Sequence, residues 1–182
     1  FLAANARGVS PFWMLVLGLI FLIATQGSRV RELLRNAAFL TGLGFAVFGA
    51  VVGAAWTLLT GTLNKMGDFP GQEMSPAAAF MQMVLAGPSD PGLIAFFGWL
   101  DTSAPGIVYV AYGFAALSLL VSALAISDKR WRVVVISSAA VFLFAPALLQ
   151  AASVGTSGYI WQGRYSLVVY VAMLLVCGIA LA

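Results

Sequence analysis

Residues 105–126 read PGIVYVAYGFAALSLLVSALAI, and this stretch decides the fold class of the chain. It holds no charged residue, and an apolar run of about 20 residues forms a helix that crosses a hydrocarbon core of about 30 Å. Asp128, Lys129, Arg130 and Arg132 follow directly. The pattern predicts a transmembrane helix that ends in a basic loop.

The rest of the chain has the same character. Of its 182 residues, 62% are hydrophobic and only 8% are charged, unlike the usage of water-soluble domains. We therefore expect an all-α, polytopic transmembrane helical bundle, forming a single membrane domain over residues 1–182 with the lipid bilayer as its solvent. About five spans are predicted by length: residues 11–25, 37–59, 106–126, 133–154, and a last one from near 165 onward.

Details within the spans predict how they pack. Gly49 and Gly53 form a Gly-x-x-x-Gly pair, which lets another helix approach closely. Pro146 removes an internal backbone hydrogen bond and is expected to kink its helix or free a carbonyl. The chain begins at Phe1 without an initiator methionine and stops at Ala182 inside an apolar run, so we expect a fragment of a longer protein.

The longest region between spans, residues 61–104, has helix signals of its own. Ser75 and Pro76 supply an N-cap and a first-turn proline, and Gly87-Pro88 supplies a stop, which predicts a helix over Pro76–Ala86. Asp90-Pro91 repeats the start signal and predicts a second short turn of helix over residues 92–97. Neither is long enough to cross the bilayer, so both are expected at the interface.

Charge asymmetry predicts orientation. Six of the nine basic residues lie in two segments, 27–36 and 127–132, that five alternating spans place on one side. That side is expected to be cytoplasmic. Segments 61–104 and 155–165 are then extracytoplasmic. The basic residues report orientation, and nothing supports nucleic-acid binding.

Arg164 is the leading candidate for a binding residue. It is the only charged residue after Arg132, and it stands between aromatics in the motif Trp161-Gln162-Gly163-Arg164-Tyr165. A guanidinium is always ionised and offers a planar fork of donors that suits phosphate or carboxylate. The alternative is an anchor that snorkels to the membrane surface.

Asp101 is the leading acidic candidate. With Thr102 beside it, it is expected to cap the third span, and it can also pair with Arg164 at the same interface. Asp68, Glu73, Asp90 and Asp101 together offer oxygen ligands for a divalent metal, but their spacing is unconstrained. Solvated loop charges are the simpler interpretation of Asp68, Glu73 and Asp90.

Several familiar chemistries are excluded by inventory. The sequence has no histidine, so histidine-dependent triads and imidazole ligands are absent. Cys177 is alone in mid-span and is expected to be a small packing residue. No cofactor is evident.

Two motifs carry a family resemblance. Phe97-Gly98-Trp99-Leu100-Asp101-Thr102 with Pro105, followed two spans later by Gln162-Gly163-Arg164-Tyr165, resembles the bacterial predicted membrane proteins called domain of unknown function 2142. Members of that family are longer, and they look similar to the GT-C glycosyltransferases that use polyprenyl-phosphate sugars on the outer face. Ser166 departs from the aromatic expected after Tyr165. The acidic catalytic motif that GT-C enzymes carry in their first outer loop has no counterpart in this chain.

The resemblance implies a location in the bacterial cytoplasmic (inner) membrane and a function in cell-envelope glycan assembly. Arg164 and Gln162 would bind the lipid phosphate of a polyprenyl-phosphate sugar donor, while Trp99, Trp161, Tyr159 and Tyr165 offer faces for sugar or isoprenoid. Asp101 would orient Arg164. The alternative is a non-catalytic membrane component, either a transporter part or a scaffold of envelope polysaccharide assembly. A transporter is expected to show charges or broken helices in mid-membrane, and only Pro146 and Gln150 hint at this.

Overall fold

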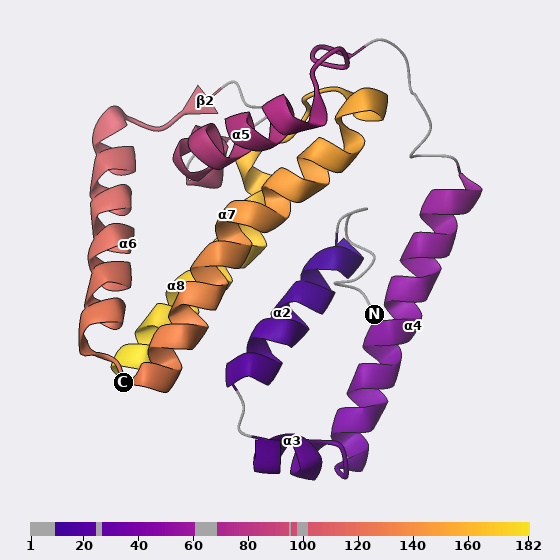
Figure 1. The fold of residues 1–182 in the computed structure, drawn as a ribbon, viewed down its shortest axis with the longest axis vertical. Coiled ribbons are helices and arrows are strands. Elements are labelled where there is room, and N and C mark those ends of the chain that lie inside the picture. Colours follow the sequence, from indigo (N-terminus) through magenta and orange to yellow (C-terminus); the bar gives the residue numbers. More distant parts are fainter. Residues whose placement is uncertain (1–9, 25–26, 61–68, 95, 98–101) are drawn as a thin grey trace. The chain divides into compact units, whose positions relative to one another are not determined.

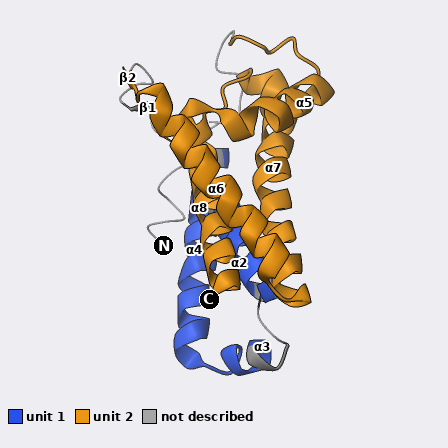
Figure 2. Cartoon of the chain, turned by 90° about the vertical axis from the view of Figure 1, so that its left-hand side faces the viewer, with its two compact units in different colours: residues 1–64 blue, residues 65–182 orange. Residues whose placement is uncertain are grey.

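The computed structural model describes residues 10–24, 27–60, 69–94, 96–97 and 102–182, and the chain divides into two compact units (Figure 2). Unit 1, residues 1–64, contains α2 (Ser10–Ala24), α3 (Gly27–Leu33) and α4 (Ala37–Leu59), with α2 packed against α4. The bounds of α4 match the prediction for the second span. It begins where Asn36 accepts the N–H of Phe39 at 3.1 Å.

Four of the five predicted spans have the length and apolar character needed to cross a membrane: α4, α6, α7 and α8. The first predicted span, residues 11–25, coincides with α2, and the residues on both sides of α2 lie outside the described ranges. Helix α2 has 15 residues, which at 1.5 Å per residue reach about 22 Å, short of a core of about 30 Å. Within segment 27–36, which was expected to be a loop, residues 27–33 form the short helix α3.

Unit 2, residues 65–182, holds the rest of the described chain (Figure 1). Its elements in order are α5 (Pro76–Ala86), η1 (Gly87–Ser89), η2 (Pro91–Leu93), β1 (Phe96–Phe97), β2 (Thr102–Ser103), α6 (Gly106–Ile126), α7 (Lys129–Ser157) and α8 (Gly163–Leu181). The expected all-α helical bundle is confirmed, with one pair of two-residue strands added.

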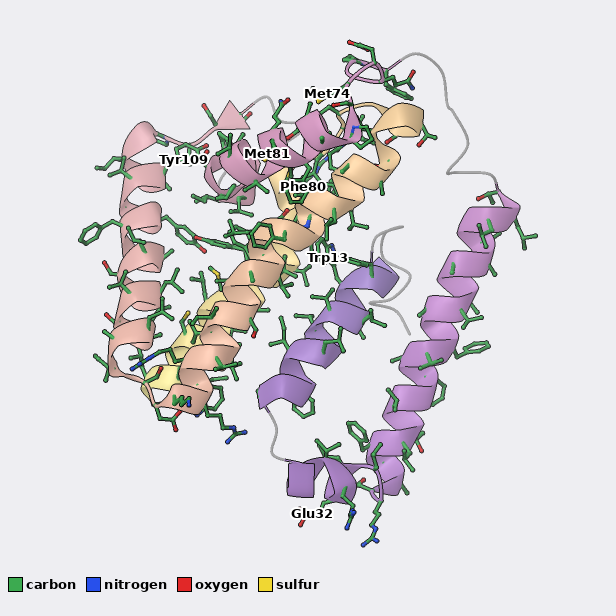
Figure 3. The ribbon with its side chains drawn as sticks, in the orientation of Figure 1. Trp13, Glu32, Met74, Phe80, Met81 and Tyr109 are labelled. Atoms are coloured by element: carbon green, nitrogen blue, oxygen red, sulfur yellow. The ribbon has the colours of Figure 1, made fainter. Side chains whose placement is uncertain are left out.

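Helices α7 and α8 form an antiparallel pair, and other elements pack on each end of it. At one end, Ala123 of α6, Val135 of α7 and Cys177 of α8 are fully buried together. At the other end, α5 lies across the C-terminal part of α7 (Figure 1). Phe80 of α5 stacks on Phe144 of α7 with ring centroids 6.3 Å apart (Figure 3). The core of unit 2 therefore runs along the α7–α8 pair.

The predicted helix over Pro76–Ala86 is confirmed, and the segment after it differs from the prediction. Helix α5 covers Pro76–Ala86 as expected, with the Ser75 side chain accepting the N–H of Ala78 at 3.2 Å. The predicted helix over residues 92–97 is wrong, because only the 3-10 turn Pro91–Leu93 forms and Phe96–Phe97 pairs antiparallel with Thr102–Ser103. A 3-10 turn holds only a few residues, and strand pairing satisfies the backbone groups that follow it.

Helix α7 is longer than predicted at both ends. It begins at Lys129, where Asp128 accepts the N–H of Trp131 at 2.7 Å, and continues past the buried Pro146 to Ser157. The basic residues expected in a loop therefore lie in the first turn of this helix. Because α8 begins at Gly163, the expected loop 155–165 is reduced to residues 158–162, and Arg164 is helical.

Candidate functional site

The candidate site lies where α5 and the two 3-10 turns meet the end of α7 and the start of α8. We call this region the junction and define it as residues 69–93 together with residues 150–166. Three of its polar side chains, Gln72, Asp90 and Gln150, bind backbone groups of segments that are distant along the chain or outside their own helix. Gln150 bonds the five-residue connection between the two long helices, and Gln72 and Asp90 bond the helix ends on either side of it.

Gln150 holds this connection against α7. Its side chain is fully buried, its Nε2 donates to the Gly158 carbonyl at 2.9 Å, and its Oε1 accepts the Trp161 N–H at 3.1 Å. A buried amide with both ends paired avoids the cost of desolvating it. Gln150 therefore has a structural explanation and does not indicate a transport path.

A second contact comes from the segment before α5. The Tyr159 N–H donates to the Pro70 carbonyl at 2.9 Å, and Gln72 Nε2 donates to the Thr156 carbonyl at 3.0 Å. Gly158 has φ of 71°, and a Cβ placed there would lie 2.5 Å from the Pro70 oxygen. Glycine is the residue that allows both this backbone conformation and this approach.

Asp90 ties the start of α8 to the 3-10 turns. Its Oδ1 accepts the Gly92 N–H at 2.7 Å, and its Oδ2 accepts the Gly163 N–H at 3.0 Å. The N-cap residue of α8, Gln162, makes no side-chain cap bond, so a carboxylate 73 residues earlier in the chain satisfies the first amide. A negative charge at a helix N-terminus adds about 0.3 to 1 kcal/mol. Asp90 is half-buried and bonded, so the interpretation as a solvated loop charge is wrong.

Gly163 makes the close approach possible. A Cβ there would overlap the Leu93 backbone nitrogen and would lie 2.8 Å from the Gly92 carbonyl carbon and 2.9 Å from Asp90 Cγ. Since two of these neighbours are backbone atoms, they cannot move aside as a flexible side chain does. The packing of η2 on α8 therefore fixes the backbone one residue before Arg164.

Arg164 lies in the first turn of α8 with its side chain half-buried. Its guanidinium carbon is 5.7 Å from the ring centroid of Tyr165. Its Nε and the Oε1 of Gln162 are buried without a hydrogen-bond partner among the described residues. An unpaired buried polar atom costs about 1 to 3 kcal/mol, and such exceptions in a native structure need an explanation. An acceptor supplied by a ligand would provide one for Arg164.

Trp161 and Tyr165 are brought together as the motif suggested. Their rings meet edge to face, with centroids 5.7 Å apart and an interplanar angle of 86°. Trp161 Nε1 donates to the Oγ of Ser166, which is buried, at 3.0 Å. Ser166 thus accepts the indole N–H, a role for the position where an aromatic was expected.

Two of the predicted site residues, Trp99 and Asp101, lie outside the described residues, so pairing of Asp101 with Arg164 stays a prediction. The N-cap position of α6 is Pro105, which makes no side-chain cap bond. The capping role predicted for Asp101 also stays a prediction. Of the four acids proposed as metal ligands, Asp68 and Asp101 also lie outside the described residues. Within the described ranges, no group of three or more possible metal-binding side chains occurs.

Tyr159 completes the junction on the side of α5. Its hydroxyl donates to the Met83 sulfur at 3.6 Å. Burial, and then the nearby Asp90 carboxylate, raise the pKa of Tyr159 above its ordinary value of 10.0. The phenol therefore stays protonated at neutral pH and remains a hydrogen-bond donor.

Four apolar helices of spanning length among the described residues define a polytopic α-helical membrane protein. The chain belongs to the DUF2142 family of predicted membrane proteins, whose family model matches residues 1–173. No curated protein and no solved structure matches it.

Proposed function

We propose that the chain binds a polyprenyl-phosphate-linked sugar on the extracytoplasmic face of the bacterial inner membrane, as part of a GT-C-like glycosyltransferase in cell-envelope glycan assembly. The observation that carries the proposal is Arg164, whose buried Nε lacks a partner among the described residues at the start of a transmembrane helix. Arginine forms bidentate bonds to phosphate.

The surface that continues from Arg164 suits a prenyl chain. Leu167, Val168 and Val171 follow it on α8, and all three are exposed apolar side chains. A lipid phosphate bound at the first turn of the helix leaves its hydrocarbon to run along this face. A small soluble anion would gain nothing from such a surface, so we favour a lipid ligand.

The predicted orientation of the chain in the membrane also favours the extracytoplasmic face for ligand binding. Two helices of spanning length, α4 and α6, lie between segment 27–36 and segment 127–132 in the chain, so we expect both basic segments on the same side of the membrane. The positive-inside bias predicts that this side is cytoplasmic and that the junction is extracytoplasmic.

Cysteine labelling in intact cells tests this orientation. In a Cys177→Ala background, an impermeant thiol reagent is expected to modify a cysteine at the exposed Glu73 and to spare one at the exposed Lys129. Permeabilised cells, in which both cysteines must react, provide the control. Labelling of Lys129→Cys alone in intact cells would invert the topology.

A non-catalytic role in the same assembly is the second candidate, and one observation favours it. Asp90 is the acid that accepts the N–H of Gly163, the residue before Arg164. Both of its carboxylate oxygens already accept backbone N–H groups. Asp90 therefore acts as a positioning residue, and we assign no catalytic base. A sugar-transfer assay with the purified protein separates the candidates, since the second predicts lipid binding without product.

Lipid binding by the protein in nanodiscs tests the proposed function. Polyprenyl phosphate is expected to bind wild type, and Arg164→Lys is expected to weaken binding about tenfold, because an ammonium cannot make the bidentate contact. Arg132→Lys is the matched control, since Arg132 Nη2 donates to the Ser127 carbonyl at the far end of α7. Equal affinity of wild type and Arg164→Lys, with both folded, would leave Arg164 as an anchor.

A further inference from the structure

The junction contains a cavity separate from the side chain of Arg164. It has a volume of about 340 Å³, at the lower end of the roughly 300 to 1,000 Å³ of small-ligand pockets. It lies between the end of α5, the two 3-10 turns and the connection before α8. Its lining includes Gln82, Met83, Ser89, Asp90, Tyr159 and Trp161.

The lining combines flat apolar faces with polar groups. Tyr159 and Trp161 contribute aromatic rings, and both are partly exposed. Gln82 contributes an exposed amide, and the Ser89 hydroxyl, which donates to the Ala86 carbonyl at 3.0 Å, keeps its lone pairs as acceptors. Each Asp90 oxygen accepts one backbone N–H and can accept a second donor. Such a lining fits a ring with an apolar face and several hydroxyl groups.

The charge of the cavity lining further restricts the chemical class of the ligand. Asp90 is the one charged residue among the described residues that line the cavity. A phosphate or carboxylate placed there would face this carboxylate at short range, which disfavours anions. The raised pKa of Tyr159 keeps its hydroxyl neutral, and this hydroxyl, which donates to the Met83 sulfur, keeps its lone pairs as acceptors. The cavity therefore suits a neutral polyhydroxyl group, whereas Arg164 suits an anion.

Asp90 connects the two places. One of its oxygens accepts the N–H of Gly163, the residue before Arg164, and its carboxylate also lines the cavity. A ligand with a neutral ring in the cavity and a phosphate beside the first turn of α8 would contact the molecule on both sides of Asp90. A sugar joined to a phosphate has this composition.

We infer that the cavity lined by Gln82, Ser89, Asp90, Tyr159 and Trp161 binds a hexose ring. The inference rests on the proposed function where the hexose is the sugar of a lipid phosphate. A hexose of a soluble glycan presents the same ring and hydroxyl groups to the cavity. Met83 and the aromatic rings cover the apolar face of the sugar, and Gln82 bonds a hydroxyl at the open edge.

The test compares three probes on the full chain in nanodiscs: polyprenyl phosphate, polyprenyl-phosphate hexose and a soluble hexose trisaccharide. Wild type is expected to bind the hexose-bearing lipid about threefold to tenfold more tightly than the bare lipid phosphate, the effect of one or two net hydrogen bonds. Gln82→Ala is expected to abolish this preference and leave the affinity for the bare lipid unchanged. Gln82 is exposed, so the variant is expected to fold.

Two further variants sharpen the result. Met81→Ala is the matched control, because Met81 is the exposed neighbour of Gln82 on α5 and does not line the cavity (Figure 3); it is expected to keep the preference. Tyr159→Phe keeps the ring and removes the hydroxyl, and it is expected to lower the preference in part.

The outcomes separate the two proposals. Arg164-dependent binding of the bare lipid with no preference for any hexose would overturn the cavity inference and leave the proposed function standing. Gln82-dependent binding of the soluble trisaccharide without any lipid binding would uphold the cavity with a soluble source and overturn the lipid-phosphate site. Absence of Gln82-dependent binding with both hexose probes would overturn the inference.

Discussion

The two ends of the α7–α8 pair are built on different principles. At the far end, Ala123, Val135 and Cys177 pack as small apolar side chains, and Asp128 caps its own helix. At the junction, Asp90 and Gln150 bond backbone groups of other segments, and glycines allow backbones to touch. Apolar packing holds helices together, whereas long-range polar bonds also fix one arrangement of the connection. This comparison indicates that the junction is the preorganised end, where a binding site is expected.

The largest difference in stability between matched variants of the two ends is expected for glycine-to-alanine substitutions in α8. Gly163→Ala is expected to lower the free energy of unfolding by about 1 to 3 kcal/mol or more, because its Cβ would overlap backbone atoms of η2. Gly178→Ala, near the far end of the same helix, meets nothing within 4 Å and is expected to be neutral or stabilising by up to about 1 kcal/mol. Thermal unfolding in detergent measures both. Equal stability of the two variants would show that η2 does not pack on α8 as described.

A second pair of variants compares two buried polar residues of α7. Gln150→Leu leaves the Gly158 carbonyl and the Trp161 N–H without their partner, and a loss of about 2 kcal/mol or more is expected. Ser138→Ala is expected to cost less than about 1 kcal/mol, because the Ser138 hydroxyl bonds only the Val135 carbonyl of its own helix at 2.8 Å. Chemical unfolding of both variants tests the ranking. A larger loss in Ser138→Ala would contradict the comparison between the ends.

The same contrast explains what could be predicted from the sequence. Hydropathy located α4, α6 and most of α7 and α8. The cap and proline signals at Ser75-Pro76 located the start of α5, and Gly87-Pro88 located its end. Both kinds of signal depend on residues that are close together in the sequence. Hydropathy also located α2, although its 15 described residues are fewer than a helix needs to cross the bilayer.

The candidate site was predictable only in part. Trp161, Gln162, Arg164 and Tyr165 were found because an isolated charge among aromatics stands out locally. The Asp90-Pro91 signal identified a helix start, but the bond from Asp90 to Gly163 spans 73 residues and leaves no periodic trace. Gln150 was noted only as a polar residue in a span. Long-range partners of this kind are set by tertiary packing.

The smallest effect is expected in the pH dependence of stability. The pKa of Tyr159 is raised in the folded state, so folding favours the protonated phenol. Its contribution is constant below the unfolded pKa of about 10 and is lost as pH rises from there through the folded pKa. Wild type is therefore expected to lose slightly more stability than Tyr159→Phe between neutral pH and pH values above about 10. Parallel profiles of the two proteins would show that Tyr159 is solvated like a free tyrosine.

The central claim is that Asp90 and Arg164 belong to one preorganised site at the start of α8. A double-mutant cycle on the affinity for polyprenyl phosphate tests it most directly, with Asp90→Asn, Arg164→Lys and the double variant, and with Asp128→Asn as the matched cap at the far end. Each junction variant is expected to weaken binding, and the double variant is expected to lose less than the two losses added, by about 0.5 kcal/mol or more. Asp128→Asn is expected to show no coupling to Arg164→Lys. Additive losses for Asp90→Asn and Arg164→Lys, or unchanged affinity in both, would contradict the account.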